Sequence, residues 1–130
     1  MKSTFDPSST YADLVHIVHV YVVEAHPGSS TVSPYTGKLS TTANAPMPHT
    51  YNDRAGLAAQ TISKFDIPEN HLMLVDDLTP GATNNPIWCT YGPAPYAGYV
   101  IGQDGVIVAS EIWAADIDFP KVIDAHLATR

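Results

Sequence analysis

Cysteine and positive charge are both scarce in this sequence, and each shortage limits what the chain can do. Cys89 is the single cysteine among 130 residues, which excludes an internal disulfide and any zinc site built from several cysteines. Six Lys and Arg residues stand against 13 Asp and Glu residues, so the formal net charge is -7. Because no basic stripe exists, nucleic acid and anionic membranes are poor partners.

Long apolar stretches are missing as well. No run is long enough to cross a bilayer, and residues 1–7 lack the apolar segment of a secretory signal. The sequence therefore predicts one cytoplasmic domain over residues 1–130. Its hydrophobic content of 45% is enough for a single core.

The apolar pattern that is present predicts alternating strands and helices. The run Leu14 to Val23 is rich in β-branched residues and favours a strand. Asn52 or Asp53 is expected to cap a helix, and Asp104-Gly105 is typical of a hairpin turn. The expected elements are a strand at 14–23, a helix at 54–64, a strand at 72–75, hairpin strands at 99–101 and 106–109, and a helix at 119–128, with long loops at 27–48 and 79–95.

A series of short motifs follows the first expected strand in a distinctive order. They are Glu24-Ala25-His26-Pro27, Ser33-Pro34-Tyr35, His49 and Asp53-Arg54. This order resembles the iodothyronine deiodinases, whose sequences read E-A-H-P, S-P-Y, H and D-R in turn. The likeness runs from about Tyr11 to the last expected helix, and it includes Tyr91-Gly92 followed by Pro95 and a hairpin.

The resemblance implies an α/β, thioredoxin-like fold in three layers, with a mixed sheet and flanking helices. Pro95 falls where such proteins place a cis-proline facing the active site. The family's first strand and helix, which carry its selenocysteine or cysteine nucleophile, have no counterpart in these residues. Tyr96-Ala97 also replaces the family's E-R pair. We therefore expect the scaffold without its first strand-helix unit, and no deiodination.

That expected deletion affects the sheet. In the thioredoxin-like fold the first strand lies between the strand that ends near Glu24 and the strand that follows Pro95. Without it, two strands carry unpaired backbone groups, which are costly when buried. Either these strands pair directly or another chain fills the gap, and we expect a homodimer formed by exchange or edge pairing.

Acid-base chemistry is the best-supported activity. Glu24 and His26 are two residues apart, so a continuing strand would place both side chains on one face at its carboxyl end, where α/β sheets bind ligands. A Glu can hold a His tautomer and make the imidazole a better base. The resemblance adds His49 as a source of protons. The competing interpretation, that Glu24 and His26 merely satisfy backbone groups, is about equally favoured.

Other side chains are expected around this pair. A metal site formed by His16, Glu24, His26 and His49 is conceivable but disfavoured, because no helical His pair or Cys pair anchors it. We therefore expect no metal and no cofactor. The residues expected to bind a flat organic substrate are Tyr35, Trp88, Cys89, Tyr91, Pro95, Tyr96 and Trp113.

Three hypotheses for function follow. The first is a cofactor-independent enzyme that isomerises, cyclises, eliminates from or hydrolyses a small aromatic or polyunsaturated molecule, and a specialised metabolic pathway would suit it. The second is a non-catalytic module that binds a ligand or a protein. The third, weaker hypothesis is a thiol-dependent oxidoreductase or dehalogenase that uses Cys89.

Overall fold

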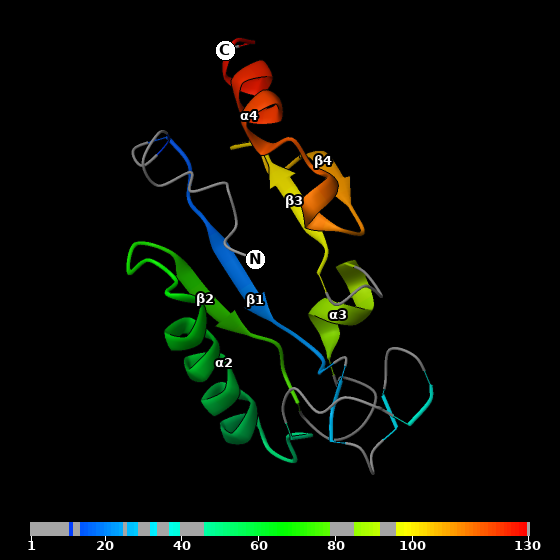
Figure 1. The fold of residues 1–130 in the computed structure, drawn as a ribbon. Helices are drawn as coiled ribbons and strands as arrows, with labels where there is room; N and C mark the ends of the chain where they lie inside the picture. Colours follow the sequence, from blue (N-terminus) through cyan, green and yellow to red (C-terminus); the bar gives the residue numbers. More distant parts are fainter. Residues whose placement is uncertain are drawn as a thin grey trace.

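The computed structural model is a mixed α/β structure in which two small sheets carry separate helices (Figure 1). It describes residues 11, 14–24, 26–28, 32–33, 37–39, 46–78, 85–91 and 96–129. The elements run in the order β1 (Val18–Tyr21), α2 (Tyr51–Phe65), β2 (Leu72–Val75), α3 (Pro86–Tyr91), β3 (Gly98–Ile101), β4 (Ile107–Glu111), the 3-10 helix η1 (Ala114–Asp116) and α4 (Phe119–Leu127).

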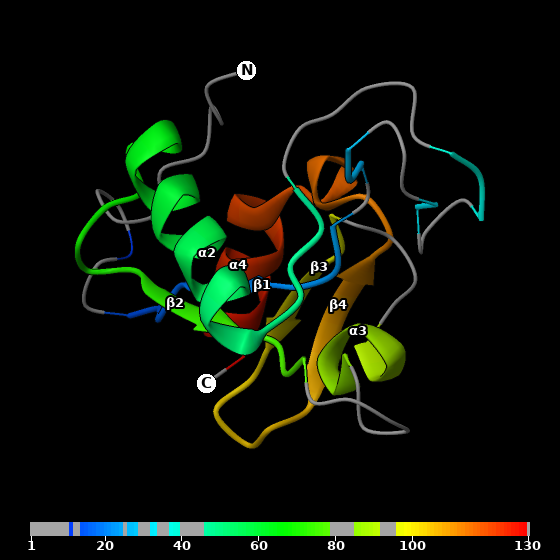
Figure 2. The ribbon, with the colours of Figure 1, turned by 90° about the horizontal axis from the view of Figure 1, so that it is seen from below.

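The first sheet pairs β1 with β2 in parallel. Val18 lies opposite Leu72 and Tyr21 lies opposite Val75. The expected strand at 72–75 is confirmed, whereas the strand expected over 14–23 is only four residues long. The apolar run from Leu14 to Val23 extends beyond β2, the four-residue strand with which it pairs, so only Val18–Tyr21 forms a strand. Helix α2 covers one face of this sheet, as the view from below shows (Figure 2).

The cap of α2 differs from the expectation. Thr50, rather than Asn52 or Asp53, is the N-cap, and its hydroxyl accepts a hydrogen bond from the Asp53 amide at 3.1 Å. The Asp53 carboxylate in turn accepts from the Thr50 amide at 2.9 Å. This reciprocal capping box satisfies two backbone donors at the helix start. The spacing Thr50-x-x-Asp53 is the sequence pattern that predicts this cap.

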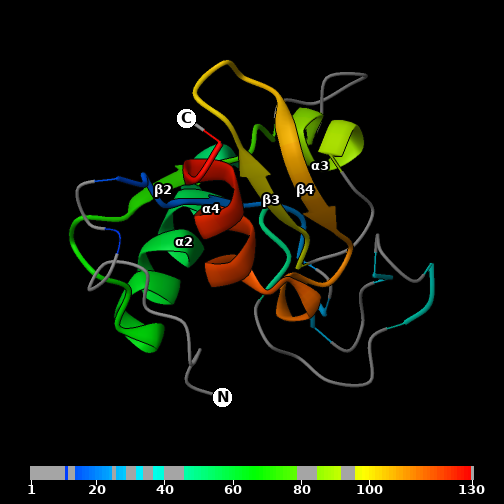
Figure 3. The same ribbon diagram turned by 90° about the horizontal axis from the view of Figure 1, so that it is seen from above.

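The second sheet is the predicted hairpin of β3 and β4. Its turn contains Gly105 with a φ of 81°, a left-handed conformation that suits glycine. At Gly98 an added Cβ would lie 2.8 Å from the Ala114 Cβ, so only glycine lets β3 pack this closely on η1. Helix α4 lies against both strands of the hairpin (Figure 3), close to its predicted bounds.

The two sheets are not joined by hydrogen bonds in the described residues. There, β1 pairs only with β2, and β3 pairs only with β4. The sequence analysis allowed β1 and β3 to pair directly, and they do not. The buried apolar side chains in the described part are few: Tyr11, Val23, Leu57, Ala58 and Ile123. None of the helices described has the length and hydrophobicity needed to cross a bilayer.

Two histidines meet at the edge of the first sheet. His19 Nε2 lies 3.0 Å from His71 Nδ1, and the two rings are 5.2 Å apart. Burial, and then the neighbouring His71, lower the pKa of His19 below its ordinary value. The folded protein therefore favours a neutral His19.

This pair predicts a loss of stability in mild acid. Above the unfolded-state pKa of about 6.5, His19 is neutral in both states, so its protonation does not change stability. Below that pKa, the unfolded chain binds the His19 proton more readily than the folded protein does. The free energy of unfolding should therefore fall between about pH 7.5 and pH 5.5 by more in the wild type than in His19→Gln. Urea denaturation at the two pH values measures this, and His16→Gln, which changes an exposed histidine, is the control. Equal losses in the wild type and His19→Gln would contradict the interpretation.

Candidate active site

A buried ion pair joins the end of β1 to the first turn of α2. Arg54 Nη2 donates to Glu24 Oε2 at 3.2 Å, and the exposed fractions of these side chains are 1% and 2%. Glu24 lies three residues beyond the end of β1. Its position is the predicted one, at the carboxyl end of a parallel strand, where α/β sheets place ligand sites.

The rest of the Arg54 guanidinium reaches the end of β2 and the start of α3. Its Nη1 donates to the carbonyl oxygens of Asp76 at 3.3 Å and Asp77 at 3.2 Å. It also donates to Asn85 Oδ1 at 2.6 Å. A guanidinium stays charged in proteins, so its burial requires acceptors of this kind on several sides.

Asp76 caps the start of α3, although it is far from that helix in the sequence. Its carboxylate accepts the amides of Ile87 at 3.0 Å and Trp88 at 2.9 Å, and it also accepts the neighbouring Asp77 amide at 3.0 Å. Asp76 is 1% exposed. An acid at this place satisfies the free backbone donors of a helix start. Asp76 is therefore a buried cap of α3.

Two polar atoms at the centre of this cluster have no hydrogen-bond partner among the described residues. They are Glu24 Oε1 and Arg54 Nε. Burial raises the pKa of Glu24, although the adjacent Arg54 acts to lower it. Burial, and then the neighbouring Glu24 carboxylate, also raise the pKa of Tyr21 above its ordinary value.

The cluster can act chemically in two ways. A small rotation would let Arg54 Nε bind Glu24 Oε1, giving a two-point pair that only fastens the fold. Alternatively, Glu24 Oε1 can accept a proton or a hydrogen bond from a small molecule. A buried carboxyl with a raised pKa is suited to such proton transfer near neutral pH.

The two predicted histidines are not held by Glu24. His26 is exposed, and no hydrogen bond joins it to the Glu24 carboxylate in the described residues. His49 is also exposed and precedes α2, where its backbone amide donates to Asp53 Oδ2 at 3.1 Å. The structure thus brings Arg54, rather than a histidine, to Glu24.

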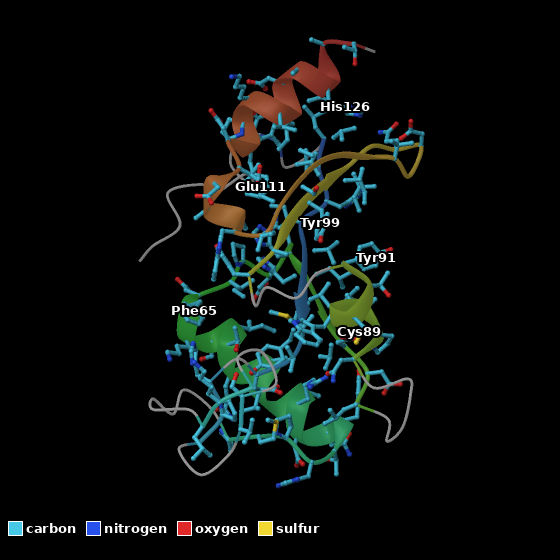
Figure 4. The ribbon with its side chains drawn as sticks, turned by 90° about the vertical axis from the view of Figure 1, so that its right-hand side faces the viewer. Phe65, Cys89, Tyr91, Tyr99, Glu111 and His126 are labelled. Carbon is cyan, nitrogen blue, oxygen red and sulfur yellow. The ribbon has the colours of Figure 1, made fainter. Side chains whose placement is uncertain are left out.

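The predicted substrate-binding residues lie in several places. Tyr35 and Pro95 fall outside the described residues. Trp88, Cys89 and Tyr91 lie on α3, and Figure 4 shows Cys89 and Tyr91 on this helix near Tyr99. The rings of Tyr91 and Tyr99 meet edge to face, with centroids 5.9 Å apart. Tyr96 and Trp113 flank the hairpin and are exposed.

Cys89 is exposed on α3. Trp88 is half-buried, and no described group accepts a hydrogen bond from its Nε1. In the part of the chain that the structure describes, no three His, Cys, Asp or Glu side chains are grouped closely enough to hold a metal ion.

The site contains three residues that were not predicted as members: Arg54, Asp76 and Asn85. A signal for Arg54 was available, because it lies on the same helical face as Leu57 and Ala58, and all three are buried. An arginine on an apolar helical face predicts a buried acid opposite it.

The ion pair predicts a large effect of one substitution on stability. Arg54→Met should lower the free energy of unfolding by about 3–5 kcal/mol, because it leaves the Glu24 carboxyl buried without its cation. Urea denaturation measures the change. Lys64→Met removes an exposed cation from the same helix and should cost less than about 0.5 kcal/mol. Similar values for the two variants would rule out a stabilising role for the pair.

Comparison with known proteins gives no family for this chain, since no family model, no curated protein and no solved structure matches it. The resemblance to the deiodinases is carried by the order of residues alone and stays a prediction.

Proposed function

We propose that this protein is a cofactor-independent enzyme that transfers protons on a small aromatic or polyunsaturated molecule, with Glu24 as the base and acid. The observation that carries the proposal is the state of the Glu24 carboxyl. It is buried, one oxygen has no described partner, and burial raises its pKa. Isomerisation, cyclisation, elimination and hydrolysis can all use such a group.

The surroundings of Glu24 support a division of roles. Arg54 holds one carboxyl oxygen at 3.2 Å, and the other, which is also buried, has no partner among the described residues. His26 is exposed two residues further along the chain and makes no described hydrogen bond to Glu24, so the proposal assigns it no role in the transfer. His49 lies just before α2 and makes no described hydrogen bond to Glu24, and it is not needed for this proton transfer.

The scaffold that we propose is the thioredoxin-like one, downstream of its first strand-helix unit. Its support is the order of elements: a strand, a helix, a parallel strand, a hairpin and a final helix. A site at the carboxyl end of β1 is also where such a sheet would place substrate.

Nitrobenzisoxazole is a suitable probe for this base. It is a flat aromatic molecule, and removal of its ring C–H proton breaks the N–O bond and releases a coloured cyanophenolate. We expect the protein to accelerate this elimination by about 100-fold over buffer. The rate should rise with pH, since the Glu24 carboxyl must lose its proton before it can accept one.

Variants separate the proposed base from other carboxylates. Glu24→Gln should abolish the acceleration, and Glu24→Asp, which keeps the charge but shortens the side chain, should reduce it about tenfold or more. Glu69→Gln changes an exposed glutamate and should have no effect. Circular dichroism shows whether each variant is folded. A folded Glu24→Gln variant with the wild-type rate would refute the proposal.

A second candidate function is an interaction module, because the uncovered face of the first sheet is apolar. Val18, Val20, Leu72 and Leu74 project from it with exposed fractions of 48%, 37%, 53% and 46%. Val18 lies opposite Leu72 and Val20 opposite Leu74, so the four side chains form one patch. We propose that a second copy of the chain covers this patch. The chain carries a net charge of -7, but the patch itself is uncharged. Two copies can therefore pack through it without repulsion between like charges.

This candidate predicts the effect of one charge on the oligomeric state. Light scattering after gel filtration should give a dimer for the wild type and a monomer for Val20→Lys, because a buried lysine would lack a counterion. Val106→Lys, in the exposed hairpin turn, is the control and should stay dimeric. A monomeric wild type at micromolar concentration would refute the dimer and leave the enzyme proposal intact.

A further inference from the structure

The ion pair between Glu24 and Arg54 is incomplete. An arginine and a carboxylate commonly share two parallel hydrogen bonds of about 2.7–2.9 Å. Here a single bond joins them, from Arg54 Nη2 to Glu24 Oε2 at 3.2 Å. Glu24 Oε1 and Arg54 Nε are both buried, and neither has a hydrogen-bond partner among the described residues. An acceptor and a donor of the same ion pair therefore stay apart, although each would satisfy the other.

The shortest described contact of the Arg54 guanidinium is with Asn85 instead. Arg54 Nη1 donates to Asn85 Oδ1 at 2.6 Å, which is shorter than the 3.2 Å bond to the carboxylate. Only the oxygen of an asparagine side chain can accept from a guanidinium, so this contact also fixes the direction of the Asn85 amide group. Because the guanidinium is planar and rigid, a held Nη1 restricts the rotation that would bring Nε to Glu24 Oε1.

The backbone of Asn85 is fixed on both sides of this contact. The Asn85 amide donates to the Asp77 carbonyl at 2.9 Å, and the Asn85 carbonyl accepts from the Cys89 amide at 2.9 Å. Its φ of 55° is left-handed, a conformation that asparagine adopts more readily than most residues. Pro86 follows, and a proline disfavours the right-handed helical conformation in the residue before it. The side-chain oxygen is thus presented to Arg54 from a fixed position.

Few other groups act on the Glu24 carboxyl among the described residues. Burial raises its pKa, whereas Arg54 and the backbone amide of Glu24 itself act to lower it. Tyr21 on β1 is a further titratable neighbour. Asp76 lies on the far side of Arg54, and its carboxylate is occupied by three backbone amides. The placement of Arg54 is therefore the main influence that opposes burial at Glu24.

We propose that Asn85 is a positioning residue that holds Arg54 in a one-point contact with Glu24. Its oxygen competes with the carboxylate for the guanidinium, so the second Glu24 oxygen stays unpaired and can carry a proton. The catalytic consequence of this assignment rests on the proposed function, because it concerns the same carboxyl group. The positioning itself can be measured without a substrate.

A pH titration of the Glu24 carboxyl carbon by carbon-13 NMR tests the assignment, with Glu24→Gln identifying the signal. Asn85→Gly removes the oxygen and suits a φ of 55°. Arg54 can then form the two-point pair, so the pKa of Glu24 should fall below its wild-type value. Asn85→Asp keeps the oxygen and adds a negative charge beside Arg54, so this pKa should stay at the wild-type value or rise. Asn70→Gly, at an exposed turn, should leave it unchanged.

Three outcomes would overturn the positioning role. They are an unchanged pKa of Glu24 in folded Asn85→Gly, an equal fall in Asn70→Gly, and a lower pKa in Asn85→Asp. The last outcome decides the matter even where Asn85→Gly fails to fold. A general loosening of the structure would lower or raise the pKa in both Asn85 variants alike, so opposite responses support the role.

The elimination of nitrobenzisoxazole gives a separate readout. At a pH well above the titration midpoint of each variant, Asn85→Gly should slow the reaction about tenfold, since a less basic carboxylate accepts a proton less readily. Asn85→Asp should keep the wild-type rate. An inactive wild type that shows the expected pKa changes would refute the proposed proton transfer and support the positioning role. An active wild type whose Glu24 pKa does not respond to Asn85 would do the reverse.

Discussion

The guanidinium of Arg54 is almost completely buried at the point where β1, β2 and α3 come together. A charge that cannot be removed by deprotonation must be compensated wherever it is buried. Arg54 finds a carboxylate after β1, two carbonyls after β2 and a side-chain amide before α3. One side chain therefore fixes the ends of three segments that are far apart in the sequence, and it does so where a parallel sheet presents ligands.

The same contact sets the chemistry of Glu24. Burial opposes ionisation of its carboxyl, and the arginine opposes protonation, so the two effects act against each other. Burial is the larger effect, and the pKa is raised. A carboxyl with a purely structural role would be stabilised most by full ionisation and a two-point pair with Arg54. The second oxygen, which has no described partner, is the observation on which the proposed proton transfer rests.

Local signals predicted the parts of the fold that depend on local contacts. The hairpin at Asp104-Gly105, β2 and α4 follow from neighbouring residues, and the structure confirms them. The strand expected over 14–23 was too long because pairing depends on the partner. Helix α3 was missed because its cap is Asp76, ten residues before Pro86. The Glu24–Arg54 pair spans 30 residues, so a local pattern can indicate that Arg54 is buried but not which acid it meets.

Polar contacts, more than a large apolar core, hold the described halves of this fold together. A two-stranded sheet is marginal by itself. The first sheet is supported by α2 and the Arg54 cluster, and the second by η1, which Gly98 allows to approach closely, and by α4. Helix α3 lies between them in the chain: Asp76 fastens its start to β2, and Tyr91 contacts Tyr99 of β3. A charge change at Asp76 would therefore act on the link between the halves as well as on the site.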